Sequence, residues 1–436
     1  MGVRWVERDL ALRGTVLFRG GIPLRMGELE RHAGSDYEIT ILPAEEHEHW
    51  RCRLRHPVHG AAEVVCLRVQ DLPPEILVQF DPRLTREEKV AILSAGSRVE
   101  VRLEAQQRDL LRERKRLLRF LSTVGGDAAV AALDELALSW WSPQALAEEL
   151  AHDAPVDISA LFTIHLVGGG AVDSGATEPF WLHTHGLQEV GYSEFDLLDP
   201  SPDSHGRCYD SLRALAFAIV EEALSPGGEP FPVVWPGGEV RLVPAREFLG
   251  AAGPGLDAWR ESLDESHLSG HAIVCDAEME RRFFGLGKSR PRPSRFFQTD
   301  FPDGLLIQFS HSASELMAQR ARQTYEYFRA LREEFATLDL PTLVKLGYPV
   351  DGDPGGREHI WFEVHECRAE SVDATCLNGP YHVAALSKGQ RGEHSVDLLS
   401  DWAIFTPFGS ITPRFQYAAR EMRADPAEAR RRLADR

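Results

Sequence analysis

The sequence lacks any apolar segment long enough to cross a membrane. Its longest apolar run, near Ala214–Val220, falls far short of the roughly 20 residues that a transmembrane helix needs. The first residues, MGVRWVERDLALRG, also lack the apolar core of a secretory leader. The six cysteines are scattered and form no Cys-x-x-Cys pair, which indicates reduced thiols and no disulfide framework. Together these absences predict a cytoplasmic protein.

Several catalytic and nucleotide-binding signatures are also missing. There is no H-E-x-x-H metalloprotease motif, no G-x-S-x-G nucleophile elbow and no dinucleotide-binding fingerprint after a strand. Gly287-Lys288-Ser289 looks like the end of a P-loop, but Arg282 stands where that motif requires glycine. The sequence therefore gives no support for nucleotide binding or for a serine hydrolase.

Basic residues are in deficit. The chain has 67 Asp and Glu against 48 Lys and Arg, a formal net charge of −19. Phosphate backbones and anionic membranes are bound by clustered positive charge, so neither nucleic acid nor a membrane is an expected partner. An acidic surface instead suits a basic protein partner through electrostatic steering.

One helix, predicted over residues 104–121, is locally basic. It has two interpretations: a site for nucleic acid or an acidic partner, or an ordinary solvated helix face interspersed with acidic residues. The net charge favours the solvated face. The basic residues concerned are Arg108, Arg112, Arg114, Lys115, Arg116 and Arg119.

The patterning predicts an α+β fold with two to three domains and mostly antiparallel sheets. We expect a small α+β domain over 1–103, helices plus an antiparallel sheet over 104–250, and a C-terminal α+β domain over 256–436. Two helices are predicted early in the second region, at Asp127–Ser139 and Pro143–Ala151, the latter capped by Ser142. The last domain should contain a small curled sheet or barrel preceded by a helix over Ser314–Leu338.

The strongest chemical signal is the segment Trp181–Leu187, which reads WLHTHGL. His183 and His185 are two residues apart on a predicted strand, so both point to one face at about 6.6–7 Å between Cα atoms. Asp196 could supply a third, oxygen ligand and leave one coordination position for water, which is the layout of a catalytic zinc site. The alternative is that both histidines end a strand and hydrogen-bond to backbone or carboxylates.

With Ser193, these residues resemble the H-x-H-x₇-S-x-x-D signature of JAMM-type zinc metalloproteases. The resemblance implies that His183, His185 and Asp196 bind Zn²⁺, that Ser193 supports the oxyanion and that an upstream glutamate is the general base. The chain departs from the pattern, because Gly186 replaces the usual proline. The base is also not identified, and its candidates are Glu135, Glu148, Glu149 and Glu178.

A second candidate site lies on a predicted strand over His359–Glu366, which alternates cleanly. His359, Trp361, Glu363 and His365 share one face, and Ile360, Phe362 and Val364 share the other. The two histidines are about 20 Å apart and cannot share a metal ion. The face is either a partner-binding surface, since Trp is enriched in interface hot spots, or is covered by the preceding helix.

Two segments of the chain resemble uncharacterised protein families. Residues from about 312 to 415 resemble domain-of-unknown-function family 2314 through a helix with Ala321-Arg322-Gln323-Thr324, the strand Glu358-His359-Ile360-Trp361, the turn Asn378-Gly379-Pro380 and the strand Ser400-Asp401-Trp402. The region before it resembles family 4026 through Trp181–Leu187 and Glu194-Phe195-Asp196. The first resemblance implies a bacterial protein, and neither implies an established activity. Their contexts, which include toxin-immunity loci, imply binding.

Two functions therefore remain in view. The first is a non-enzymatic protein-binding or regulatory protein with an immunity-like role, which needs no cofactor. The second is a zinc-dependent hydrolase that uses His183, His185 and Asp196 with Ser193 assisting.

Overall fold

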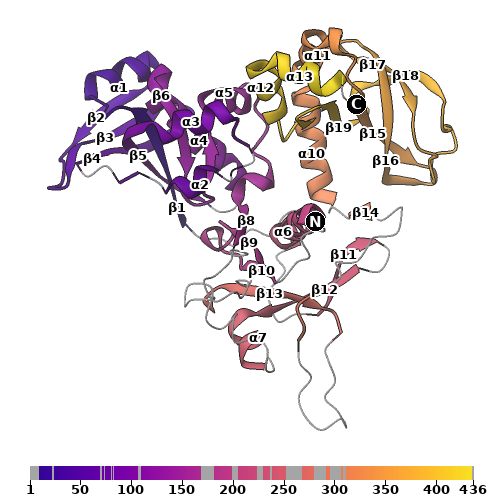
Figure 1. The fold of residues 1–436 in the computed structure, drawn as a ribbon, viewed down its shortest axis with the longest axis horizontal. Coiled ribbons are helices and arrows are strands. Elements are labelled where there is room, and N and C mark those ends of the chain that lie inside the picture. The colour runs from indigo at the N-terminus through magenta and orange to yellow at the C-terminus, as the bar shows by residue number, and fades with distance from the viewer. Residues whose placement is uncertain are drawn as a thin grey trace.

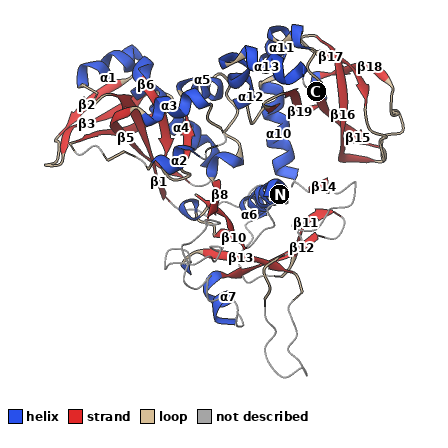
Figure 2. Ribbon diagram, in the orientation of Figure 1, coloured by secondary structure: helices blue, strands red, loops and turns tan. Residues whose placement is uncertain are grey.

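Three open sheets organise the molecule, and helices lie against each of them (Figures 1 and 2). The computed structural model describes residues 9–21, 24–68, 71–72, 74–79, 81, 83–106, 110–167, 181–198, 205–222, 229–235, 238–251, 268–278, 291–294, 306–307 and 311–434. We refer to the N-terminal unit (9–150), the middle unit (158–307) and the C-terminal unit (311–434). The predicted α+β class, with mostly antiparallel sheets, is confirmed.

The N-terminal unit is a seven-stranded antiparallel sheet in the order β2-β3-β4-β5-β1-β6-β7. Helix α4 packs on one face, where Leu117 and Leu121 meet Leu12 and Val16, and α2 and α3 cover part of the other. Its strands are β1 (Asp9–Arg19), β2 (Glu38–Leu42), β3 (Glu48–His56), β4 (Gly60–Leu67), β5 (Ala95–Gln106), β6 (Ala129–Asp134) and β7 (Ser139–Trp141). Its helices are α1 (Met26–Ala33), α2 (Glu75–Gln79), α3 (Arg86–Leu93), α4 (Leu110–Gly125) and α5 (Pro143–Leu150).

Two predictions fail in this unit. The expected boundary at residue 103 lies inside it, because β6 and β7 extend the sheet of β1–β5. The expected helix Asp127–Ser139 is wrong, since Ala129–Asp134 is a strand between β1 and β7. A strand covered on both faces is apolar throughout and shows no period of two, so its sequence imitates a helix. The Ser142 cap is confirmed, as its hydroxyl accepts from the Ala145 amide.

The basic face predicted for α4 is largely internal. Arg114 is 1% exposed and bonded to Asp134, and Lys115 is 5% exposed. The Lys115 ammonium donates to the carbonyls of Glu149 (2.8 Å) and Ala154 (2.7 Å), and burial lowers its pKa to about 8. Arg112 is exposed, whereas Arg108 lies outside the described residues. The solvated-face interpretation therefore holds for only part of the helix.

The middle unit is a sheet in the order β14-β11-β12-β13-β10-β9-β8, in which β10 and β13 pair in parallel. Helix α6 covers one face through Leu212 and Phe217, and α7 packs through Phe248 on the other. Its strands are β8 (Thr163–Val167), β9 (Trp181–His185), β10 (Glu194–Leu198), β11 (Phe231–Trp235), β12 (Gly238–Pro244), β13 (His271–Asp276) and β14 (Leu306–Ile307), with helices α6 (His205–Glu222) and α7 (Ala245–Ala251). Residues 252–267, where the 250/256 boundary was expected, lie outside the described residues. However, β13 and β14 continue the middle sheet beyond that boundary.

The C-terminal unit is an antiparallel sheet in the order β18-β17-β16-β15-β19-β20, open at β18 and β20. The single helix predicted over Ser314–Leu338 is instead two helices, α10 and α11, which precede the sheet. Phe328 and Leu331 of α11 pack with Phe362 and Trp402. Its helices are α10 (His311–Gln323), α11 (Tyr325–Glu334), α12 (Tyr417–Ala424) and α13 (Pro426–Ala434). Its strands are β15 (Thr342–Val350), β16 (Asp353–Cys367), β17 (Ser371–Cys376), β18 (Arg391–Ser395), β19 (Leu399–Thr406) and β20 (Gly409–Ile411).

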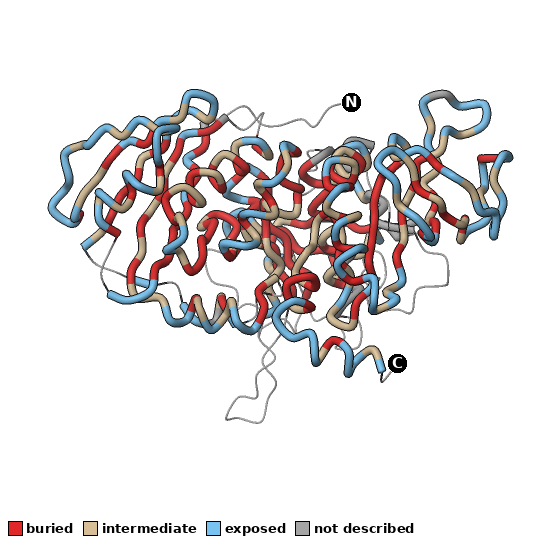
Figure 3. The backbone as a smooth tube through the Cα atoms, turned by 90° about the horizontal axis from the view of Figure 1, so that it is seen from above, coloured by how far each residue is buried: buried red, intermediate tan, exposed pale blue. Residues whose placement is uncertain are grey.

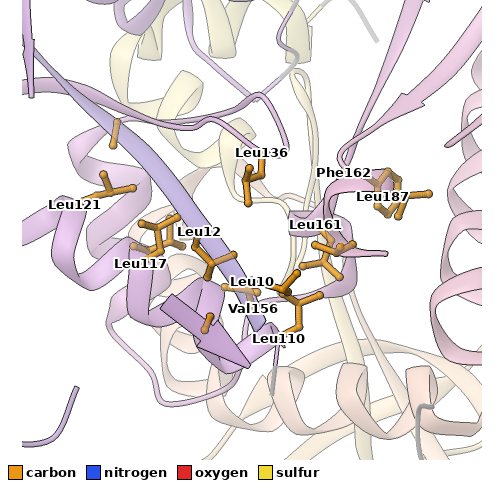
Figure 4. Packing of buried hydrophobic residues seen from close by; sticks show 14 of the residues in the cluster. Leu10, Leu12, Leu110, Leu117, Leu121, Leu136, Val156, Leu161, Phe162 and Leu187 are labelled. Carbon is orange, nitrogen blue, oxygen red and sulfur yellow. The ribbon is translucent and has the colours of Figure 1, made fainter. Parts of the chain in front are cut away.

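The N-terminal and middle units share one apolar core, whereas the C-terminal unit has its own. Figure 4 shows the junction, where β1 and α4 meet the segment around Val156 and Leu161 and the turn at Leu187. In Figure 3 the buried segments gather in the middle of the molecule, and many exposed segments lie at its periphery.

None of the described helices is both long and apolar enough to cross a membrane.

Candidate metal centre

Three neighbouring strands of the middle sheet bring His183, Asp196 and His271 together. His183 in β9 is the direct antiparallel partner of Asp196 in β10. Asp196 pairs in parallel with Ile273 in β13, and His271 lies two residues earlier on the same face. One ligand atom from each of the three side chains lies within 4.8 Å of the other two.

The geometry and chemistry of this group suit a metal ion. His271 Nδ1 lies 3.1 Å from Asp196 Oδ2, and His183 Nδ1 lies 4.0 Å from Asp196 Oδ1. The two imidazole rings are 6.3 Å apart and inclined by 27°. Nitrogen and oxygen ligands at about 2.0–2.2 Å from zinc lie roughly 3.4 Å from one another, so small side-chain rotations would close the group around an ion. The side chains are only 11%, 0% and 10% exposed, which makes the group an internal one.

His185 does not join this group. Strand β8 places Thr163 opposite His185 and His165 opposite His183. The His165 ring stacks on that of His185 at 5.9 Å and 14°, and lies 5.4 Å from that of His183. Burial, followed by the neighbouring His185, lowers the pKa of His165 to about 4. The predicted pair His183 and Asp196 is thus brought together, and His271 occupies the place expected for His185.

Glu194 holds the turn that follows β9. It is 3% exposed, and its carboxylate accepts from the Thr184 hydroxyl (2.8 Å) and the amides of Gly186 (2.7 Å) and Gln188 (2.8 Å). The Thr184 oxygen in turn accepts from the Phe195 amide at 3.0 Å. Ser193, half-buried, directly precedes β10 and is not a member of the metal-ligand group. The start of β10 is therefore fixed against the end of β9, on which His183 stands.

Gly186 explains the departure from the metalloprotease pattern. Its φ is +119°, a conformation closed to proline, whose ring fixes φ near −65°. A Cβ at this position would lie 2.4 Å from the Leu161 carbonyl oxygen and 3.0 Å from Ala137 Cα. The chain therefore leaves β9 in a direction that the proline of that signature would not permit.

Three of the four glutamates considered as a general base bond to residues outside the group. Glu135 accepts a hydrogen bond from the Thr15 hydroxyl, and Glu148 and Glu149 are paired with arginines of the C-terminal unit. Glu178 lies outside the described residues.

A second possible ligand group, Glu45, His47 and Glu48, lies around the start of β3. Sequence reasoning missed it, although a carboxylate-rich turn is a visible signal. The Arg51 guanidinium binds Glu48 Oε1 at 2.5 Å and Glu45 Oε1 at 2.8 Å. An arginine already neutralises these carboxylates, so the group favours a structural ion pair over a metal site.

The second predicted site, on β16, has the expected alternation. Ile360, Phe362 and Val364 are buried, whereas Trp361 is half-buried and Glu363 is exposed. Helices α10 and α11 pack against the Phe362 face, so the interpretation that they cover Trp361 is wrong. The Lys345 ammonium instead lies 5.5 Å from the Trp361 ring centre.

The two histidines of this face bind hydroxyl groups of their own sheet. His359 Nδ1 lies 2.8 Å from Ser400 Oγ, and His365 Nε2 lies 2.7 Å from Thr375 Oγ1. These contacts give both histidines a structural role.

Residues that carried the C-terminal family resemblance also bond to one another. The Trp402 indole donates to Thr324 Oγ1 at 3.0 Å, which ties the sheet to the junction of α10 and α11. The Glu358 carboxylate accepts from the amides of Tyr381 and His382, each at 2.7 Å. The strand motif is thus bonded to the two residues that follow the Asn-Gly-Pro turn.

Comparison with known families agrees with these motifs. Residues 167–245 match the family model described as "Protein of unknown function (DUF4026) C-terminal". Residues 312–429 match the model described as "Uncharacterized protein conserved in bacteria (DUF2314)". No curated protein and no solved structure matches the chain. Both predicted resemblances are confirmed, and the chain joins a middle segment similar to the first family to a C-terminal segment similar to the second.

Proposed function

We propose that the protein binds a divalent transition metal, zinc in the first instance, through His183, Asp196 and His271. The observation that supports this is the convergence of three ligand side chains, one from each of three adjacent strands, within 4.8 Å. Imidazole nitrogen and carboxylate oxygen are ligands that zinc accepts readily. Two histidines and one carboxylate also form the set used by non-haem iron, so iron is the competing ion.

The role that fits best is non-enzymatic, in a binding or regulatory protein. The group lies inside the middle unit, and an ion there would fix β9, β10 and β13 to one another. A bound metal would supply a Lewis acid and an acidified water to a hydrolase, but hydrolysis also needs an acid-base group nearby. Glu194, the adjacent carboxylate, already accepts three hydrogen bonds. The zinc-dependent hydrolase is therefore the alternative proposal.

Metal content tests the ligand set directly. Protein without a histidine tag is analysed for zinc and iron by inductively coupled plasma mass spectrometry, beside His271→Ala and His185→Ala. These two variants remove the same side chain from different places on one sheet. Our proposal expects about one ion per chain, lost in His271→Ala and kept in His185→Ala. If His183, His185 and Asp196 were the ligands, as in the metalloprotease signature, the ion would be lost in His185→Ala and kept in His271→Ala. A wild-type protein that takes up no metal from zinc-supplemented buffer contradicts both ligand sets.

A second proposal, protein binding, is supported by the outer face of β16. Trp361 remains half-buried there, and Phe405 on β19 is 38% exposed. Glu363 is exposed on the same face, and the chain is strongly acidic, so the partner we propose is basic.

A decalysine peptide serves as the probe for this face. Binding should weaken in Trp361→Ala and Glu363→Gln. It should persist in Glu370→Gln, which removes an equal charge from an exposed residue elsewhere in the unit. Equal loss in both glutamate variants would indicate non-specific charge attraction and contradict the proposal.

A further inference from the structure

Charged side chains of the C-terminal unit pair with carboxylates of the N-terminal unit. The C-terminal unit has its own apolar core, although Leu316 of α10 packs against the core of the other two units. The last turn of helix α5 in the N-terminal unit contains the consecutive residues Glu148 and Glu149, and in Figure 1 this helix lies beside α12. Each of the two carboxylates binds an arginine of the C-terminal unit.

Glu149 binds Arg320 of α10. The Arg320 guanidinium donates to both carboxylate oxygens, at 3.0 Å for the Nη1–Oε1 bond, and its Nε donates to the Pro413 carbonyl at 2.8 Å. The ammonium of Lys115, in α4 of the N-terminal unit, lies 3.5 Å from the same carboxylate. Glu149 and Arg320 are 6% and 4% exposed, so water is nearly excluded from this pair.

Glu148 binds the C-terminal helix α12. Arg420 Nη1 donates to Glu148 Oε2 at 2.8 Å, and Arg423 Nη1 lies 3.6 Å from Glu148 Oε1. Arg420 also reaches α3, where its Nε lies 2.9 Å from Glu88 Oε1. Arg320 and Arg420 of the C-terminal unit therefore face three glutamates of the N-terminal unit, whereas Arg423 pairs chiefly with Glu334 of its own unit, at 2.8 Å.

Such an interface differs physically from an apolar one. A buried ion pair adds little net stability, because desolvation offsets most of the attraction between the charges. Removing one partner, in contrast, leaves an uncompensated buried charge and strongly disfavours the contact. Polar interfaces between domains of one chain also resemble transient protein–protein interfaces, which open readily. The arginine–glutamate pairs thus fix how the two units dock, and another acidic surface could compete with the glutamates for the arginines.

We propose that Glu148 and Glu149 form a latch. It holds the C-terminal unit closed on the N-terminal unit and masks a basic face made of Arg320 and Arg420, which are 4% and 7% exposed. When the latch is released, the C-terminal unit separates as a folded body and presents this face to an acidic peptide segment. The inference is independent of the metal centre, which lies in another unit.

Arginine modification measures the state of the latch in the full-length protein. Phenylglyoxal reacts with accessible guanidinium groups, and peptide mass spectrometry locates the products. The test variant is Glu148→Gln/Glu149→Gln. The matched control is Glu366→Gln/Glu393→Gln, which removes two carboxylates from the exposed ion pairs of Arg368 within the C-terminal unit.

In the wild type and the control, Arg320 should react slowly. In the latch variant its reaction should accelerate at least about tenfold, because the buried guanidinium groups lose their counter-charges. Circular dichroism should remain that of the wild type, which separates undocking from unfolding. If the double variant does not fold, Glu148→Gln alone replaces it, since Glu148 lies at the less buried end of the pair.

A decaglutamate peptide then tests the masking. It should bind the latch variant and bind neither the wild type nor the control measurably under the same conditions. An Arg320 that stays protected in a folded latch variant overturns the latch. A latch variant that opens but does not bind the peptide overturns the masked basic face.

Discussion

Gly186 directly follows His185, the last residue of β9, and a substitution there tests how β9 is positioned. In Gly186→Ala the alanine must adopt the φ of Gly186, +119°, in a region that L-residues rarely occupy. That conformation costs on the order of 1–3 kcal/mol. The Cβ would also lie 2.4 Å from the Leu161 carbonyl oxygen and 3.2 Å from that of Leu136. Relieving such overpacking costs a further 1–3 kcal/mol, roughly. We therefore expect a destabilisation of about 4 kcal/mol.

Gly389→Ala is the matched control. Gly389 also has a positive φ, +81°, but nothing lies within 4 Å of its would-be Cβ. That variant should lose only the conformational part, about 1–2 kcal/mol. The difference between the two variants isolates the contact of Gly186 with the carbonyls of Leu136 and Leu161.

Hydrogen exchange of the β9 amides provides the assay, because a single unfolding free energy is poorly defined for a chain with several units. A loss of 4 kcal/mol corresponds to roughly a thousandfold faster exchange through local opening. The amides of β1 should change less. If the β9 amides of Gly186→Ala exchange no faster than the amides around residue 389 in Gly389→Ala, Gly186 is not packed against the Leu136 and Leu161 carbonyls.

Three further predictions concern buried charge. Burial lowers the pKa of His152 to about 4, so the folded protein binds this proton less readily than the unfolded chain does. The free energy of unfolding should fall by about 1–2 kcal/mol as pH drops from about 6.5 to 4, after allowance for partial exposure of the ring. The fall should be smaller in His152→Asn, and melting temperatures measured across this pH range test both expectations. Arg114→Met should cost about 3–5 kcal/mol, because it leaves Asp134 buried without its counter-charge, whereas Arg112→Met on the exposed side should cost under about 0.5 kcal/mol. Equal denaturant midpoints for the two would contradict the buried pair. Glu194→Ala should lower the melting temperature more than Glu194→Gln, since glutamine keeps an oxygen for the two backbone amides at Oε1.

Local patterns in the sequence predicted those features that depend on neighbouring residues. The alternation of His359–Glu366 predicted both the strand β16 and which of its side chains are buried. Ser142 before Pro143 predicted the start of α5. In each case the determining contacts lie within a few residues, so the backbone period and the capping chemistry suffice.

The candidate metal centre was predicted only in part. The i, i+2 spacing placed His183 and His185 on one face, and of the predicted ligands the structure brings His183 and Asp196 together. His271 was not, because its approach depends on the parallel pairing of β10 with β13, which are far apart in the sequence. No local pattern in a sequence reveals which distant strand lies beside which.

By itself, the sequence determined the α+β class, the family resemblances and the faces of amphipathic elements, since each follows from composition or short-range periodicity. Tertiary structure decided the rest. It made the apolar segment Ala129–Asp134 a central strand, buried Arg114 and Lys115 inside the N-terminal unit, and matched Glu148 and Glu149 with arginines of the C-terminal unit. A charged side chain carries no local sign of the partner it will meet, because burial and pairing are properties of the packed chain.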